Sequence, residues 1–322
     1  MTGKQISTTT LARPLGAVAL LALGACGGGG DGGPDTGQLS IAVTDAPIDM
    51  GITKVNVRFT GIEVKPENGP PIVFDFGADG ARTIDLLQLQ GEGSAYLIVD
   101  ETVPAGRYLW TRLMVEAKKD DFDSNVEKSS GEMYPLYIPS GAESGLKLQS
   151  EFIVPAGGVA DFVVDWNLAQ AIHAPTGQDM NHYLRPALKI TNRAESGVVR
   201  GTVDAALIDE NAPTACAGGN RVYLFARPGD GEVLMDDLDM VTDDPRAEVL
   251  TTASVDYSVD RDAWEWVFGF VAPGSYTVAF TCSAMADDPA LDEYPEDATS
   301  AFGFASQADV EVVAAGDATV AL

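Results

Sequence analysis

Residues 55–65 read Val-Asn-Val-Arg-Phe-Thr-Gly-Ile-Glu-Val-Lys, so apolar and polar side chains alternate on both sides of the Thr60-Gly61 pair. A period of two places the apolar side chains on one face of an extended chain, which is typical of a β-strand that packs against a core. Residues 39–43, Leu-Ser-Ile-Ala-Val, alternate in the same way. Both stretches therefore predict β-strands.

Similar short segments recur along the chain and are separated by turn sequences such as Asn68-Gly69-Pro70-Pro71. The further predicted strands are residues 72–76, 96–99, 108–116, 134–138, 151–154, 160–166, 184–191, 198–203, 221–225, 264–271, 275–280, 308–313 and 318–322. Residues 168–173 predict one short helix, and residues 85–89 fit either a strand or a helical turn. Many short strands broken by Gly and Pro indicate an all-β chain of sandwich or barrel type.

The strand pattern divides into two groups of ordinary domain size. We predict two consecutive β-sandwich domains at residues 39–192 and 193–322. Residues 26–38 begin with Cys26 and continue as GGGGDGGPDTGQ, a composition that predicts a flexible tether.

Two short segments resemble each other within these domains. Residues 103–108, Val-Pro-Ala-Gly-Arg-Tyr, and residues 271–276, Val-Ala-Pro-Gly-Ser-Tyr, each join a proline–glycine turn to a strand that starts with tyrosine. Proline presets the turn, and glycine supplies backbone freedom. The repeat favours two related sandwiches.

The N-terminus carries two positive charges, Lys4 and Arg13, followed by an apolar segment at residues 14–25. That segment has 12 residues, whereas a membrane-spanning helix needs about 20. Leu23-Gly24-Ala25-Cys26 resembles the lipobox of bacterial lipoproteins. The resemblance implies that residues 1–25 are a removed signal peptide and that Cys26 becomes a palmitoylated membrane anchor. An ordinary secretory signal with an unmodified Cys26 is the alternative.

By the same resemblance, Gly27 in place of aspartate favours the outer membrane. With Cys26 lipidated, Cys216 and Cys282 remain as an even pair, and in an oxidising compartment we expect a disulfide between them. A metal site on these cysteines is less favoured, because they lack both C-x-x-C spacing and nearby histidines.

The chain is strongly acidic, with 48 Asp and Glu against 20 Lys and Arg residues. Such a surface repels nucleic acid and anionic lipid headgroups, so neither is an expected partner. At 45% hydrophobic residues, the chain has enough apolar side chains for a packed core.

Two family resemblances follow from motifs in order along the chain. The first is carried by residues 39–47 (Leu-Ser-Ile-Ala-Val-Thr-Asp-Ala-Pro), 55–64, 84–87 (Ile-Asp-Leu-Leu), 103–108, 139–141, 145–148, 162–166 (Phe-Val-Val-Asp-Trp) and 184–190. Residues 39–192 thus resemble the bacterial family named domain of unknown function 4382, which implies an exported all-β module without an established activity. Residues 197–322, with Gly201-Thr202-Val203 and residues 273–278, resemble transthyretin-like, carboxypeptidase-regulatory-like sandwiches. Those are generally non-catalytic.

Few residues point to catalysis. The chain has two histidines, His173 and His182, which we expect to be plain surface residues, and it lacks the G-x-S-x-G and H-E-x-x-H motifs. Acidic residues are so numerous that spacing cannot select a working carboxylate pair. The tryptophans, among them Trp264 and Trp266, are expected in the core, and an exposed ring would favour sugar binding.

Residues 121–132, Asp-Phe-Asp-Ser-Asn-Val-Glu-Lys-Ser-Ser-Gly-Glu, predict a possible Ca²⁺ loop. Oxygen-bearing side chains occupy the positions that an EF-hand-type loop uses. They are Asp121, Asp123, Asn125, Ser129 and Glu132. Val126 replaces the usual glycine, and a solvated hairpin loop is the alternative.

Taken together, these patterns predict a non-enzymatic lipoprotein of the cell envelope that binds or scaffolds another molecule. Its expected partners are the membrane, through the lipid anchor, and an unknown protein or glycan. The alternative function is a carbohydrate-binding or carbohydrate-hydrolysing surface protein.

Overall fold

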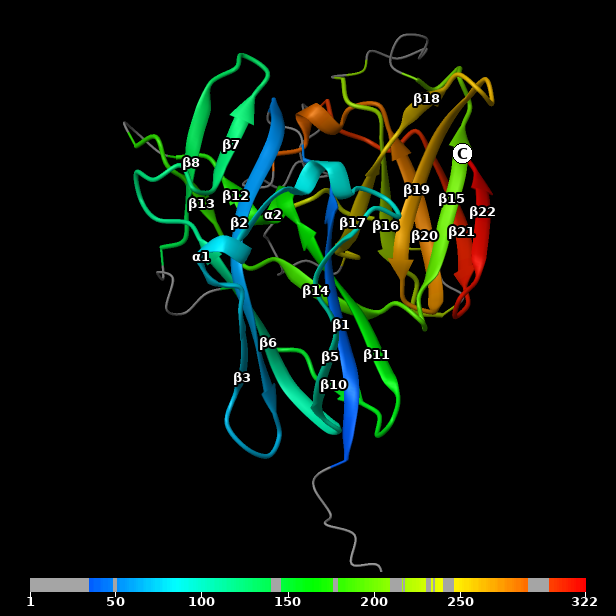
Figure 1. The fold of residues 1–322 in the computed structure, drawn as a ribbon. Helices are drawn as coiled ribbons and strands as arrows, with labels where there is room; N and C mark the ends of the chain where they lie inside the picture. The colour runs from blue at the N-terminus through cyan, green and yellow to red at the C-terminus, as the bar shows by residue number, and fades with distance from the viewer. Residues whose placement is uncertain are drawn as a thin grey trace, which may run out of the picture. The chain divides into compact units, whose positions relative to one another are not determined.

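A computed structural model of the chain describes residues 35–48, 51–139, 146–175, 179–208, 216, 218–229, 233, 235–239, 246–288 and 301–322. The predicted signal peptide, Cys26 and most of the tether lie outside these residues. The fold is all-β as predicted, and the described strands form four sheets (Figure 1).

Two sheets enclose the first core. The smaller has the order β14 (Leu188–Asn192), β11 (Val159–Asn167), β1 (Thr36–Ala46) and β5 (Ala95–Pro104). The larger has the order β10 (Phe152–Val154), β6 (Gly106–Glu116), β2 (Ile52–Pro66), β7 (Asn125–Lys128), β8 (Met133–Tyr137), β13 (His182–Leu184) and β12 (Ile172–His173). β3 (Ile72–Asp75) and β4 (Arg82–Asp85) pair with β2, and β9 (Leu146–Leu148) pairs with β6.

Two four-stranded sheets enclose the second core. One has the order β18 (Asp256–Ser258), β19 (Ala263–Val271), β15 (Gly197–Val203) and β22 (Asp317–Ala321). The other has the order β17 (Val249–Ser254), β16 (Arg221–Ala226), β20 (Gly274–Thr281) and β21 (Ser306–Val312). In Figure 1, β19, β15 and β22 lie side by side at one edge of the ribbon.

The described helices are all short: α1 (Gly77–Gly80), α2 (Leu168–Ala171), and the 3₁₀ helices η1 (Leu86–Leu89) and η2 (Ala284–Ala286). α2 occupies the first part of the predicted 168–173 helix, and the chain then returns to a strand. The ambiguous 85–89 segment is the 3₁₀ turn η1. Asp85 caps η1, because its Oδ1 accepts a hydrogen bond from the Leu87 amide at 3.3 Å.

β16 contributes to both cores. Val222 and Leu224 point into the second core, whereas Tyr223 and Phe225 pack into the first. Because alternate side chains of a strand point to opposite faces, this sheet is covered on both sides. The first core therefore contains side chains from both predicted domains.

The two related segments of the sequence form the same local structure. Tyr108 donates a hydrogen bond to the Pro104 carbonyl, and Tyr276 donates one to the Ala272 carbonyl, each at 2.8 Å and four residues back. Both rings are buried, at 0% and 7% exposure. Each hydroxyl thereby ties a strand to the turn that precedes it.

Arg193 joins the first group of strands to the second. Its guanidinium carbon lies 5.2 Å from the Tyr96 ring centre and 4.6 Å from that of Phe270, and Nη1 donates to Ser94 at 2.8 Å. Stacking of a guanidinium between two aromatic rings favours a fixed geometry.

Gly91 and Gly269 allow the loop before β5 to approach β19 closely. Gly91 has a φ of +65°, and a Cβ there would lie 2.6 Å from the Val267 side chain. A Cβ at Gly269 would overlap the Gly91 carbonyl oxygen. The loop before β5 can thus reach β19 only without side chains at these positions.

The contacts group residues from Pro34 onward into one compact unit. The domain boundary near Arg193 was inferred from the strand pattern of the sequence, and it stays a prediction. None of the described helices has the length and apolar composition to cross a membrane.

Candidate functional site

The two sheets built from β1–β14 are called the first sandwich, and those built from β15–β22 the second. A cavity of about 400 Å³ lies where η2 and β16 meet residues of the first sandwich. We call it the Asp287 pocket. Its walls are mainly aliphatic and include Ile48, Ala169, Leu238 and Met285. Its volume is typical of small-ligand sites, which combine apolar walls with a few polar groups.

Three of the polar groups that line the pocket are largely buried. Tyr223 (1% exposed) donates its hydroxyl hydrogen to Oδ2 of Asp287, and the Leu238 amide donates to Oδ1 at 3.2 Å. Arg221 (6% exposed) donates to the Pro47 carbonyl at 3.3 Å. Asp288, at the rim, is exposed.

Burial raises the pKa of Asp287 to about 7, and the negative charge of Asp237 acts in the same direction. The Tyr223 hydroxyl and the Leu238 amide oppose this shift, because both stabilise the ionised carboxylate. A strongly shifted carboxyl group in a cavity marks a candidate functional site.

The disulfide between Cys216 and Cys282 helps to position the pocket. The two Cα atoms lie 5.5 Å apart, so the predicted pairing is present. Next to this disulfide, the amides of Ala284 and Met285 donate to the carbonyls of Gly219 and Gly218 at 3.1 and 2.9 Å. These bonds fix η2, which carries Met285 and precedes Asp287.

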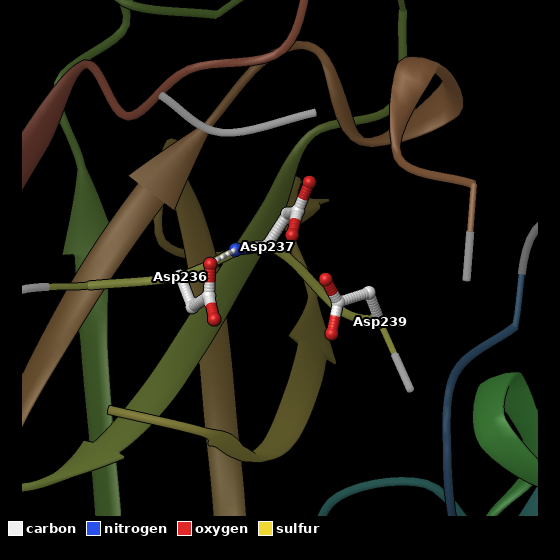
Figure 2. Close-up of side chains that lie close together, drawn as sticks. All are labelled: Asp236, Asp237 and Asp239. Atoms are coloured by element: carbon white, nitrogen blue, oxygen red, sulfur yellow. Dashed lines mark hydrogen bonds between the residues drawn. The ribbon is translucent and has the colours of Figure 1, made fainter. Parts of the chain in front are cut away.

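Three further carboxylates lie beside Leu238 (Figure 2). Asp236, Asp237 and Asp239 are 3%, 1% and 4% exposed, and one oxygen atom from each lies within 4.8 Å of the others. The Asp237 amide donates to Oδ1 of Asp236 at 3.2 Å. Buried carboxylates need protons, cationic side chains or a bound cation to offset their repulsion.

From the sequence, the acidic runs at 236–244 and 287–297 are weaker cation-site candidates than residues 121–132, because their spacing is irregular. The structure brings Asp237 and Asp287 close enough for one charge to shift the other's pKa. The hydrogen bond from the Leu238 amide to Asp287 shows the same proximity. Neither run by itself contains that information.

The five predicted calcium ligands are not gathered by the structure. Asp121 and Asp123 precede β7, whereas Ser129 and Glu132 lie in the turn after it. β7 is extended and separates the two pairs by about 13 Å, at about 3.3 Å per residue. Oδ1 of Asn125 accepts a hydrogen bond from Asn56 at 3.0 Å. The backbone does not curl here, because Val126 (0% exposed) belongs to the strand and packs into the core.

The expectation that both histidines are surface residues is wrong for His182, which is 1% exposed beneath Tyr134. Burial lowers its pKa, and nearby Lys128 adds to the effect. His173 stands opposite Tyr183 on the paired strands β12 and β13. Because His182 is the neighbour of Tyr183 on β13, its side chain points to the other face of the sheet, and the two imidazoles do not form a shared site.

The tryptophans lie mainly in the core, as predicted. Trp166 and Trp266 are 0% and 3% exposed. Trp110 is half-buried, and Lys147 and Arg112 cover its ring at 4.2 and 5.3 Å.

A second cavity, of about 470 Å³, lies on the outer face of β15, β18 and β19, and we call it the Glu265 groove. Asp256 stands directly opposite Glu265, and Thr202 stands opposite it on the other side. Arg261 forms an ion pair with Glu265 at 2.8 Å. The groove offers hydroxyl, carboxylate and guanidinium groups on a sheet surface.

Comparison with known proteins concerns mainly the first sandwich. Residues 36–186 match the family model described as Domain of unknown function (DUF4382). This confirms the resemblance inferred from the motifs. The DUF4382 region supplies Ile48 and Ala169 to the Asp287 pocket, whereas Asp287 itself lies outside it. No curated protein matches the chain.

Solved structures show only distant similarity. The Bacillus anthracis TIE protein is 10% identical, with 89% of this chain and 33% of that chain covered and a TM-score of 0.20. A leucine-rich repeat protein from Bacteroides thetaiotaomicron is 13% identical, with 89% and 26% covered and a TM-score of 0.18. The minor pilin GBS52 of Streptococcus agalactiae is 9% identical, with 88% and 94% covered and a TM-score of 0.18. The chain thus spans a third or less of the first two proteins.

Proposed function

We propose that this chain is a non-enzymatic binding module of the bacterial cell envelope, anchored by acyl groups on Cys26, and that it binds its partner at the Asp287 pocket. The observation that carries the proposal is the pocket itself. It combines aliphatic walls with the half-buried carboxyl group of Asp287 and the buried hydroxyl and guanidinium groups of Tyr223 and Arg221. Binding sites for small groups have this composition.

The shared core supports a rigid module. Domains in one chain move relative to each other unless their interface is large and apolar. Here Tyr223 and Phe225 of β16 pack into the first core. A rigid body holds both walls of the pocket in place, which lowers the entropic loss on binding.

The sequence supports the anchoring part of the proposal. The lipobox-like Leu23-Gly24-Ala25-Cys26 implies acylation, and Gly27 favours the outer membrane. The acidic surface disfavours direct contact with anionic headgroups, so the acyl chains would provide the membrane attachment.

Photocrosslinking in the producing cell tests the binding site. A benzoylphenylalanine at position 285, in the pocket, should give a discrete adduct that the Asp287→Asn change removes. The same probe at Val259, which is 82% exposed on the β18–β19 turn, is the matched control. Adducts that are absent from position 285, or equal at both positions, would contradict the proposal.

Labelling with an alkyne analogue of palmitate tests the anchor. We expect label on the wild-type chain in the outer-membrane fraction and none on Cys26→Ser. Label that persists on the variant, or a wild-type chain without label, contradicts acylation at Cys26.

Carbohydrate binding at the Glu265 groove is the second candidate function. The facing Asp256 and Glu265, with Thr202 beside them, provide the acceptors and donors that sugar hydroxyls need. A glycan array should show a ligand whose binding Glu265→Gln weakens. An array without any binding would refute this candidate.

A further inference from the structure

The Asp287 pocket has more acidic than basic groups around it. Asp287 and Asp288 line it, and the buried carboxylates of Asp236, Asp237 and Asp239 belong to the segment that contributes Leu238 to the lining. Among the described residues here, the basic side chains are Arg221 and Arg246. Five aspartates thus face two arginines, and the electrostatic potential favours a positively charged ligand.

Asp287 is oriented to accept further hydrogen bonds. Tyr223 and Leu238 hold the carboxylate through one hydroxyl and one amide donor. A carboxylate has about four lone-pair positions. The two donors therefore fix the group and leave it able to accept from an ammonium group in the cavity.

The rest of the pocket suits a hydrocarbon chain. Ile48, Ala169, Ala284 and Met285 provide aliphatic surface around the carboxylates. Burial of each methylene group contributes about 0.8 kcal/mol to binding. A ligand that joins a cationic head to an aliphatic chain satisfies both parts of the lining.

We propose that the Asp287 pocket binds a primary ammonium group carried on an unbranched aliphatic chain, either a lysine side chain or a free alkylamine. This inference rests on the binding function proposed above and names the chemistry of its ligand. The ammonium group donates to Asp287 and lies near Asp288, and the chain lies along Met285 and Ile48.

A divalent cation fits this pocket less well. Calcium takes six to eight oxygen ligands, and aliphatic walls supply none. Oxygen atoms are instead concentrated at Asp236, Asp237 and Asp239, which are not part of the pocket lining. Calcium is therefore a competitor to examine in the experiment.

Isothermal titration calorimetry on the purified full chain tests the proposal with matched six-carbon probes. We expect hexylamine to bind saturably, 1-hexanol to bind at least tenfold more weakly, and hexanoate to give no heat. Nα-acetyl-lysine methylamide tests the lysine source of the same ammonium group. Its binding alongside hexylamine indicates a peptide ligand, and hexylamine binding alone indicates a free amine.

Two pairs of variants test whether the heat of hexylamine binding arises at the Asp287 pocket. Asp287→Asn should weaken hexylamine binding at least tenfold, whereas Asp79→Asn, which removes an exposed carboxylate on α1, should leave it unchanged. Met285→Lys supplies a tethered competing ammonium group and should weaken hexylamine binding. Met285→Gln, of similar length but neutral, should not. The second pair keeps the test valid if Asp287→Asn does not fold.

The outcomes separate the ligand class from the binding function. Binding of hexanol or hexanoate without hexylamine would overturn the ammonium assignment and leave the binding function standing. Binding of none of the probes would contradict both. Displacement of hexylamine by micromolar calcium chloride alone would also overturn the proposal, because it would assign the site to a metal.

Discussion

The two sheets of residues 197–322 differ in how they are covered. The sheet of β16 and β20 packs against one core with Val222 and Val278 and against the other with Tyr223 and Ala279. The sheet of β15 and β19 faces the second core, and its outer side forms the Glu265 groove. The first sheet is therefore covered on both faces, whereas the outer side of the second meets the loop around Gly91 at Val267 and Gly269 and forms the groove beside this contact.

This difference has a functional meaning. The doubly covered sheet contributes Arg221 and Tyr223 of its interior strand β16 to the Asp287 pocket, and both side chains are buried. The other sheet offers a groove that combines exposed residues, such as Asp256 and Arg261, with the half-buried Glu265. Pre-organised binding is therefore expected at the first sheet and adaptable, weaker binding at the second.

Truncation of Phe225 is the strongest test of the comparison. Phe225 is 0% exposed in the first core although it belongs to the second group of strands. Phe225→Ala should lower the free energy of unfolding by about 4 kcal/mol. Hydrogen exchange should show weaker protection in β1 as well as in β16.

Phe268→Ala is the matched control, because Phe268 is 3% exposed in the second core. It should lower protection mainly in β15 and β19. Two separate unfolding transitions, with Phe225→Ala affecting only the second, would break the comparison.

Removal of the disulfide should have the next largest effect. Cys216 and Cys282 are 66 residues apart, and the double change to serine should lower stability by about 3 kcal/mol through the unfolded chain. Urea unfolding of both proteins measures the difference. Equal midpoints under non-reducing conditions would show that the bond does not stabilise the fold.

The pH dependence of stability tests the contact between the sandwiches at Asp165. This residue lines a water-sized cavity together with Thr44, Thr252 and Gly269. Burial raises its pKa to about 6, while Lys189 opposes the shift. The folded chain therefore keeps a proton that the unfolded chain releases between pH 4 and 6, and stability falls as the pH rises through this range.

Asp165→Asn should remove that loss. At pH 7.5 we expect the variant to be more stable than the wild type by about 2 kcal/mol, and below pH 4 we expect no gain. Thermal melts across this pH range measure the effect. A gain of the same size at every pH would exclude titration of Asp165 as its cause.

The smallest effects are expected at Tyr108 and Tyr276, whose hydroxyl groups each tie a strand to the preceding turn; we call these two structures the tyrosine corners. Tyr108→Phe and Tyr276→Phe each remove one hydroxyl hydrogen bond to a carbonyl, at 2.8 Å in both cases. Each should lower stability by about 1 kcal/mol. Clearly unequal losses in denaturant titrations would show that the two corners are not energetically equivalent.

Much of the fold could be predicted from alternation and turn residues. The strands containing residues 39–43 and 55–65 are confirmed, and so are β6 and β20, the strands that follow the two proline–glycine turns. β17 and β18 were not among the predicted strands, because residues 229–262 are rich in acidic residues. Acidic residues before and after Val249-Leu250-Thr251-Thr252 obscured the strand pattern of this segment, although its β-branched residues favour a strand.

The candidate site could not be predicted in the same way. Asp237 and Asp287 are 50 residues apart, and only tertiary packing brings them together. Conversely, the 121–132 spacing fitted a calcium loop, although Val126 favours a strand that keeps the oxygens apart. The lipid anchor at Cys26 and the transthyretin-like resemblance stay predictions.

The double burial of β16 also affects biogenesis. A chain is synthesised from its N-terminus, so the strands of the first sandwich emerge before Tyr223 and Phe225, which complete their core. Until residues 223–225 can pack against the first sandwich, that apolar surface stays uncovered and favours aggregation. A fragment cut near residue 192 would remain in this condition permanently.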